Sequence, residues 1–132
     1  MKSNSKFKNI KIFYLLIIFF FSIFVNQYYG YIGVFPIDTF LFFDSGNRVL
    51  NGEFPIKDFW AVTGLTNDFI QAILFKIFGV SWFSYVLHAS LMNFVIAFFT
   101  FHTLLKFKLN INFYIIYALL VSIIAYPVAG TP

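Results

Sequence analysis

The residues best suited to acid–base chemistry in this 132-residue sequence are its five carboxylates, which lie close together in the chain. They are Asp38, Asp44, Glu53, Asp58 and Asp68. A positioned carboxylate can act as a general base, and hard oxygen ligands of this kind suit Mg²⁺ or Mn²⁺. Cysteine is absent, so no disulfide or thiolate chemistry is available. The sequence also contains no Walker A loop, dinucleotide fingerprint, HExxH motif or zinc-ligand spacing.

Local spacing gives several polar side chains a structural interpretation beside a chemical one. Asp38 is a candidate N-cap for a helix over residues 38–51. Asp44 and Arg48 stand four positions apart and are expected to pair across one helical turn. Arg48 is alternatively a ligand for a lipid phosphate, because guanidinium binds phosphate bidentately, and Lys57 is a weaker candidate for the same contact.

The two histidines fall in one long apolar stretch. Ionisable groups inside a membrane are functional candidates by default. The separation between His88 and His102 corresponds to about 21 Å along a helix, so the two cannot share a metal ion. The favoured interpretation is structural for both, and Asn93 between them is expected to bond to a neighbouring helix.

Composition indicates that membrane helices carry or flank these residues. Hydrophobic residues make up 61% of the chain and charged residues 11%, whereas a soluble domain carries about 25% charged residues. Apolar stretches over 10–29, 82–105 and 113–128 are predicted to cross the membrane. The first also resembles a signal peptide, but it ends in Asn-Gln-Tyr-Tyr and not in a cleavage site of small residues. The prediction is an all-α polytopic membrane protein with about three spans.

Residues 30–81 are predicted to form a large extracytoplasmic loop that holds short helices. Glycine, proline and charged residues punctuate this segment, and irregular backbone cannot face lipid. Within it, residues 66–78 are predicted to form an amphipathic interfacial helix, which Thr66 caps and Gly79 ends. The apolar side of that helix is expected to carry Leu65, Phe69, Ile73, Ile77 and Phe78.

The lysines predict the orientation of the chain. With three spans, the tail over residues 1–11 and the link over 106–112 lie on the same side. These two segments hold six of the nine basic residues and none of the five acids. The positive-inside rule therefore places them, and the N-terminus, in the cytoplasm. Lysines clustered in this way suit anionic inner-leaflet lipids better than nucleic acid, and a bacterial inner membrane is the favoured location.

Short motifs occur in a definite order between Pro36 and Gly79. Asp38 follows the first apolar stretch, a turn comes at residues 50–52, residues 55–59 read Pro-Ile-Lys-Asp-Phe, and residues 74–79 end in Phe-Gly. In this order the segment resembles the first extracytoplasmic loop of the C-type glycosyltransferases. These polytopic enzymes use polyprenyl-phosphate sugars; protein O-mannosyltransferases and bacterial aminoarabinose transferases are examples.

The sequence departs from the pattern of that family at two positions. Thr39 stands where the family often has Glu, which weakens the case for two adjacent carboxylates acting together, and Ile56 stands where it often has Tyr. The resemblance covers about residues 10–105, a small part of a full-length family member. It implies that the chain is the incomplete N-terminal part of a longer enzyme and is inactive alone.

The resemblance also implies roles for individual residues. Asp38 would be the general base that takes the proton from an acceptor hydroxyl as it attacks the anomeric carbon of the donor sugar. Asp58 would lie near the donor phosphate or a divalent metal, Mg²⁺ or Mn²⁺, or would brace the loop. The donor would be a polyprenyl-phosphate sugar, and the acceptor a lipid, a glycan or a protein.

Two other functions stay open at this point. The chain is alternatively a small, non-catalytic accessory or structural membrane protein whose loop acids are dispensable. A part of a transporter or flippase is a third interpretation, which predicts charged or broken membrane helices along a path. The predicted spans carry no acids, and this counts against the third interpretation.

Overall fold

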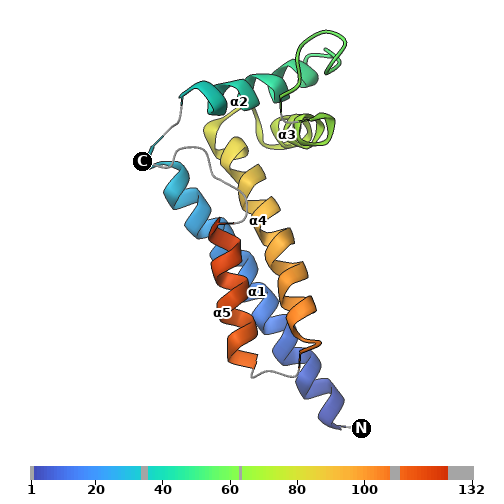
Figure 1. Cartoon of the computed structure of the whole chain (residues 1–132), viewed down its shortest axis with the longest axis vertical. Helices are drawn as coiled ribbons and strands as arrows, with labels where there is room; N and C mark the ends of the chain where they lie inside the picture. Colours follow the sequence, from blue (N-terminus) through green and yellow to red (C-terminus); the bar gives the residue numbers. More distant parts are fainter. Residues whose placement is uncertain (1, 34–35, 63, 108–110, 125–132) are drawn as a thin grey trace. The chain divides into compact units, whose positions relative to one another are not determined.

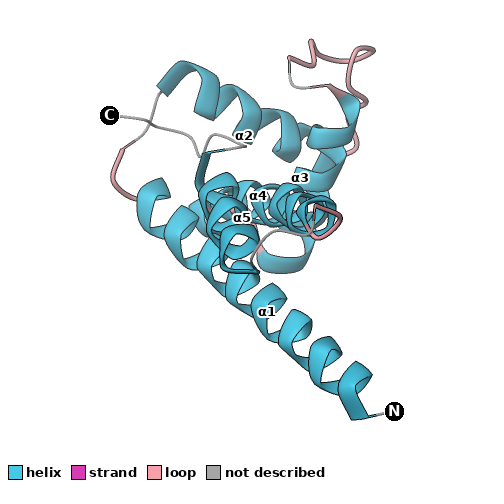
Figure 2. Ribbon diagram, turned by 60° about the horizontal axis from the view of Figure 1, so that its bottom comes forward, coloured by secondary structure: helices cyan, strands magenta, loops and turns pink. Residues whose placement is uncertain are grey.

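A computed structural model describes residues 2–33, 36–62, 64–107 and 111–124 of the chain (Figure 1). These residues form helices and loops without any strand, as the colouring of Figure 2 shows. The helices are α1 (Lys2–Gly30), α2 (Pro36–Leu50), α3 (Leu65–Phe78), α4 (Trp82–Leu104) and α5 (Ile111–Ile124). The predicted all-α class is confirmed.

Two of the helices are long and apolar enough to cross a membrane, judged by length and composition. They are Asn9–Gly30 of α1, with 22 residues, and α4, with 23 residues, against the about 20 that a bilayer core requires. They coincide with the spans predicted over residues 10–29 and 82–105, and they suggest a membrane protein. The apolar helix Asn112–Ile123 is shorter, and residues 125–128 of the third predicted span lie outside the described residues. A third crossing stays a prediction.

The described residues fall into two compact units, to which α1 and α4 both contribute. The first, here called the bundle unit, comprises residues 2–25, 90–107 and 111–124. Its core joins α1, α4 and α5 through residues that are almost fully buried: Ile18, Ala97, Phe101, Tyr114 and Ala118. Small residues at such contacts allow membrane helices to approach closely.

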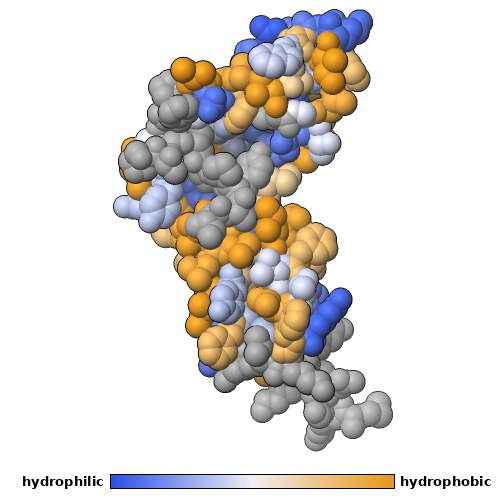
Figure 3. Space-filling model, in the orientation of Figure 1, coloured by the Kyte–Doolittle hydropathy of each residue, from blue (hydrophilic) through white to orange (hydrophobic). Residues whose placement is uncertain are grey.

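Polar groups inside the bundle unit bond to backbone, and large apolar groups face outwards. The Ser22 hydroxyl donates to the carbonyl oxygen of Ser90 at 2.9 Å. Phe20 and Phe24 of α1 are 64% and 75% exposed, and Phe99 of α4 is 62% exposed. Hydrophobic side chains accordingly cover much of the bundle helices on the face drawn in Figure 3. An apolar exterior of this extent suits lipid better than water.

The second unit, here called the α2–α3 unit, comprises residues 26–33, 36–62 and 64–89. Helix α2 packs against α3, and the contact is close at Gly46. A Cβ atom added there would overlap the Gln71 side chain, lying 2.8 Å from its Cβ. The ring of Phe43 lies 4.8 Å from that of Phe75 between their centroids, which extends the contact. Only glycine therefore lets the two helices pack as they do.

Two predicted helix caps are wrong, whereas the predicted ends are confirmed. Helix α2 begins at Pro36, which places Asp38 in its first turn and not at its cap; proline suits the first helical position because its missing N–H needs no partner there. Helix α3 begins at Leu65 after Gly64, so Thr66 also lies inside the helix. Gly52 and Gly79, with φ of 94° and 84°, follow α2 and α3 in a conformation that favours glycine.

Candidate functional site

The predicted base, Asp38, lies exposed in the first turn of α2. It makes no hydrogen bond or ion pair with another described residue. Ile37 and Phe40, one position before it and two after it in the same helix, are 76% and 57% exposed. The first turn of a helix favours negative charge, because the helix dipole and unbonded N–H groups are positive there.

At the other end of α2, Arg48 is held by two carboxylates. Its Nε atom lies 2.7 Å from Oδ2 of Asp44, and its Nη1 atom lies 3.2 Å from Oε2 of Glu53. The guanidinium also lies over the Phe59 ring, 5.5 Å from the centroid. The hydrogen bond and charge of Asp44, with the charge of Glu53, raise the pKa of Arg48. The predicted pair with Asp44 is confirmed, and Glu53 joins it from beyond the helix end.

Asp58 closes a tight turn immediately after this ion pair. The Phe54 N–H donates to Oδ2 of Asp58 at 2.7 Å, and the Asp58 N–H donates to the Phe54 carbonyl oxygen at 2.9 Å. Within the turn, the Ile56 N–H donates to the Phe59 carbonyl oxygen at 2.8 Å. These bonds hold Ile56 at φ 74°, which a β-branched residue rarely adopts. Asp58 therefore braces the loop, one of the roles that the sequence left open.

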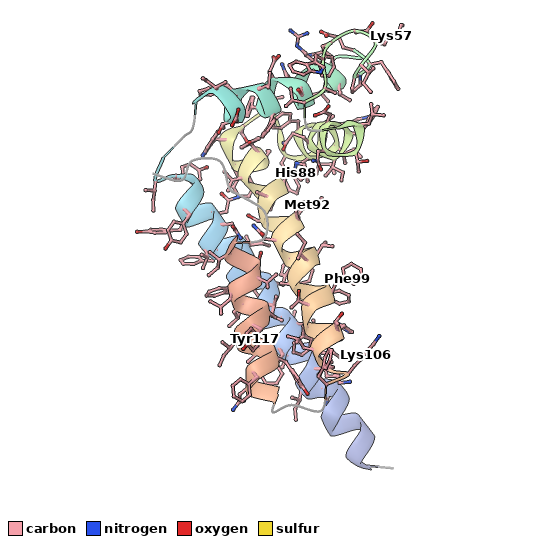
Figure 4. All side chains as sticks on the ribbon, viewed as in Figure 1. Lys57, His88, Met92, Phe99, Lys106 and Tyr117 are labelled. Atoms are coloured by element: carbon pink, nitrogen blue, oxygen red, sulfur yellow. The ribbon has the colours of Figure 1, made fainter. Side chains whose placement is uncertain are left out.

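Lys57 lies at the tip of the same turn and is more exposed than Arg48, the other predicted phosphate contact. Its side chain is 78% exposed, against 42% for Arg48. Its Nζ atom lies 3.9 Å from Oδ1 of Asp58, the outer limit of an ion pair. Figure 4 shows Lys57 on the outermost part of the loop between α2 and α3. Of the two predicted phosphate contacts, Lys57 is thus more available than Arg48.

The described side chains do not assemble a metal site. No group of three or more His, Asp or Glu side chains gathers at metal-binding distance within the described ranges. Oδ2 of Asp58 accepts a backbone N–H, and no hydrogen bond or ion pair joins Asp38 to it. A divalent metal stays a prediction of the resemblance alone.

A buried polar group on α3 and α4 was missed from the sequence. Asp68 and Gln71 are each 2% exposed and His88 is 5% exposed. His88 Nδ1 lies 3.0 Å from Oε1 of Gln71, and Nε2 of Gln71 donates to the Ser84 carbonyl oxygen at 3.4 Å. The sequence does contain one signal for this group, because the spacing of Asp68 and Gln71 puts both on one helical face. Nothing in the sequence indicated that this face is covered.

The histidines agree with the structural interpretation. His88 bonds to Gln71 inside the α2–α3 unit, where Figure 4 marks it on α4. His102 belongs to the bundle unit, and its Nδ1 atom lies 3.1 Å from the Phe98 carbonyl oxygen one turn earlier. The first contact joins α3 to α4, whereas the second lies within α4.

Comparison with known proteins adds nothing to these contacts. The chain matches no protein-family model, no curated protein and no solved structure.

Proposed function

We propose that this chain forms the N-terminal membrane region of a glycosyltransferase that acts on a polyprenyl-phosphate sugar. The acceptor, a lipid, a glycan or a protein, would lie outside the cytoplasm. Support comes from two helices long enough to span a bilayer and from the motif order between Pro36 and Gly79. The lysine distribution supports a cytoplasmic N-terminus, and the location we propose is a bacterial inner membrane.

The observation that carries the proposal is the situation of Asp38. An exposed carboxylate in the first turn of a helix, with no described partner, is available to a substrate. In the proposed step an acceptor oxygen bonds to the anomeric carbon while the bond from that carbon to the phosphate oxygen breaks. Polyprenyl phosphate leaves, and the hydroxyl proton passes to Asp38. A base of this kind contributes about 10²–10⁴-fold to the rate.

The surroundings of Asp38 suit a substrate that arrives in the membrane. Ile37 and Phe40 expose apolar surface on the first turns of the same helix, which would suit the chain of a polyprenyl donor or a lipid acceptor. Lys57 is the proposed contact to the donor phosphate, because Arg48 is held by two carboxylates. Asp58 is proposed to position Lys57 by bracing the turn.

A non-catalytic accessory protein is the second candidate, and one observation favours it. Asp44, Glu53 and Asp58 all have local bonding partners, so most of the acidic loop is stable without any ligand. Under this alternative Asp38 would also be dispensable.

Replacement of Asp38 tests the proposal. Membranes carrying the complete reading frame that contains this chain would receive polyprenyl-phosphate-linked radiolabelled glucose, mannose and arabinose in turn. Asp38→Asn is expected to lower label transfer by about 10²-fold or more. Asp44→Asn is the matched control, since it changes an exposed carboxylate on the same helix, and should retain transfer. Equal transfer by the two variants would overturn the role of Asp38, and absence of transfer from the parent protein would favour the accessory alternative.

A further inference from the structure

Helix α3 buries two polar side chains and leaves a row of apolar side chains exposed. Asp68 and Gln71, each 2% exposed, are buried together with Ala72, Leu74 and Phe75. The exposed residues include every fourth position along the helix, which forms one stripe. The α3 stripe consists of Leu65 (38% exposed), Phe69 (38%), Ile73 (56%) and Ile77 (65%). A helix on a water-facing surface carries charged and polar residues on its exposed side instead.

Hydrogen bonds of Gln71 fix which side of α3 is covered. Because Nε2 of Gln71 donates to the Ser84 carbonyl oxygen, its Oε1 atom faces His88. Oε1 can only accept, so His88 carries its hydrogen on Nδ1. Rotation of α3 to bury the stripe would break both hydrogen bonds of Gln71. The buried polar groups would then lose their bonding partners. The close contact of Gln71 with Gly46 further restricts rotation of α3.

Chain length places α3 beside a helix that can span the membrane. Only residues 79–81 separate Phe78, the last residue of α3, from Trp82, the first of α4. Such a link reaches at most about 14 Å. Trp82 Nε1 donates to the Gly30 carbonyl oxygen at 2.8 Å, so α4 begins where α1 ends. The end of α3 thus lies close to the level at which both candidate spans leave the bilayer.

Aromatic side chains mark the same level. Tyr28 and Tyr29 near the end of α1 are 63% and 52% exposed, and Trp82 stands at the start of α4. Tyrosine and tryptophan are enriched where membrane helices meet the headgroups. Phe78 and Phe83, on either side of the link, lie 6.4 Å apart between ring centroids. Aromatic residues therefore lie around the link and the end of α3, as expected where membrane helices meet the headgroups.

We propose that the α3 stripe lies in the bilayer interface, with its four apolar side chains in contact with lipid. The exposed Lys76 would extend towards the headgroups, as lysine does at the edge of a membrane. Lipid contact accounts for a continuous row of exposed apolar side chains on a helix that buries Asp68 and Gln71. Lipid contact of the stripe requires membrane insertion but no glycosyl transfer. The test of this contact and the test of the proposed function can therefore fail independently.

The absence of cysteine from the chain makes a direct test possible. Single variants Ile73→Cys, on the stripe, and Asp44→Cys, on α2, would be labelled with bimane and placed in phosphatidylcholine–phosphatidylglycerol vesicles. The two positions are matched, with Ile73 56% exposed and the Asp44 side chain 55%. Quenching by nitroxide-bearing lipid is then compared with quenching by aqueous iodide.

At Ile73→Cys, lipid nitroxide is expected to quench the bimane fluorescence at least about three times as strongly as iodide, because the label lies among lipids. Asp44→Cys should show the reverse preference. Ile77→Cys, four residues along the stripe, should repeat the first result and guards against local damage at one site. Strong iodide quenching on the stripe would overturn the proposal in favour of a water-facing surface. Protection from both quenchers would overturn it in favour of a protein partner or a second copy.

Discussion

The two ends of α2 hold their carboxylates in different ways. At the first turn, Asp38 is exposed beside Ile37 and makes no contact with another described charge. At the last turn and in the loop beyond it, Arg48 binds Asp44 and Glu53, and Asp58 closes a turn of backbone. One end is thus available for chemistry, while the other is committed to structure. Acidic residues that are close in sequence need not share a function.

Hydrogen bonds restrain the backbone of the loop that follows the last turn of α2. A buried or well-bonded turn can hold a residue in an unfavourable backbone conformation, as the turn around Ile56 does at φ 74°. The bonds from Phe54 to Asp58 and from Ile56 to Phe59 supply the restraint. Lys57 is carried at a defined position by this turn, which suits a contact with a phosphate.

Substitution of Gly46 should have a large effect on the structure of α2, because it separates α2 from α3. Gly46→Val places atoms where Gln71 lies and is expected to cost about 1–3 kcal/mol. Ala72, which is 7% exposed, should then become reactive: labelling of an Ala72→Cys thiol by maleimide should rise about tenfold.

Gly33→Val is the control for this change, since a Cβ at Gly33 meets nothing within 4 Å. It should leave labelling of the Ala72→Cys thiol unchanged. Equal labelling in the two glycine variants would show that the contact at Gly46 does not hold the helices together.

Removal of the Arg48 charge should have the smallest effect. The ion pairs of Arg48 are exposed to solvent, and such pairs contribute little to stability. Arg48→Gln is expected to raise hydrogen exchange at the Phe54 amide by less than about threefold, and added salt should reduce even that difference. A large rise would mean that the ion pair, and not Asp58, holds the turn.

Much of the helix content could be predicted, because long apolar runs and glycines at helix ends are local signals. The helices over 10–29 and 82–105, the Asp44–Arg48 pair and the end at Gly79 all follow from spacing of this kind. The start of α2 could not be placed as well, because Asp38 resembles a cap and Pro36 precedes it by only two positions.

The packing of α3 was beyond what its sequence could supply. The pattern identified an apolar side but not which side α2 and α4 cover. The covered side proved to hold Asp68 and Gln71 among apolar residues, while the predicted apolar side is exposed. That choice depends on Gly46 and His88, which are distant in sequence from Gln71. Likewise, bracing of the loop was one of several roles predicted for Asp58. The hydrogen bond from the Phe54 N–H identifies that role.

The most direct test of the difference between the two ends of α2 is one experiment with two readouts. Asp38→Ala and Asp58→Ala, each in the complete reading frame, would be compared for sugar transfer from the polyprenyl-phosphate donor and for hydrogen exchange at the Phe54 amide. Asp38→Ala should lower transfer by about 10²-fold or more and leave the amide protected. Asp58→Ala should speed exchange about tenfold, for the loss of one hydrogen bond, and lower transfer less. Transfer that survives Asp38→Ala, or an amide still protected in Asp58→Ala, would contradict the assignment of chemistry to one end and structure to the other.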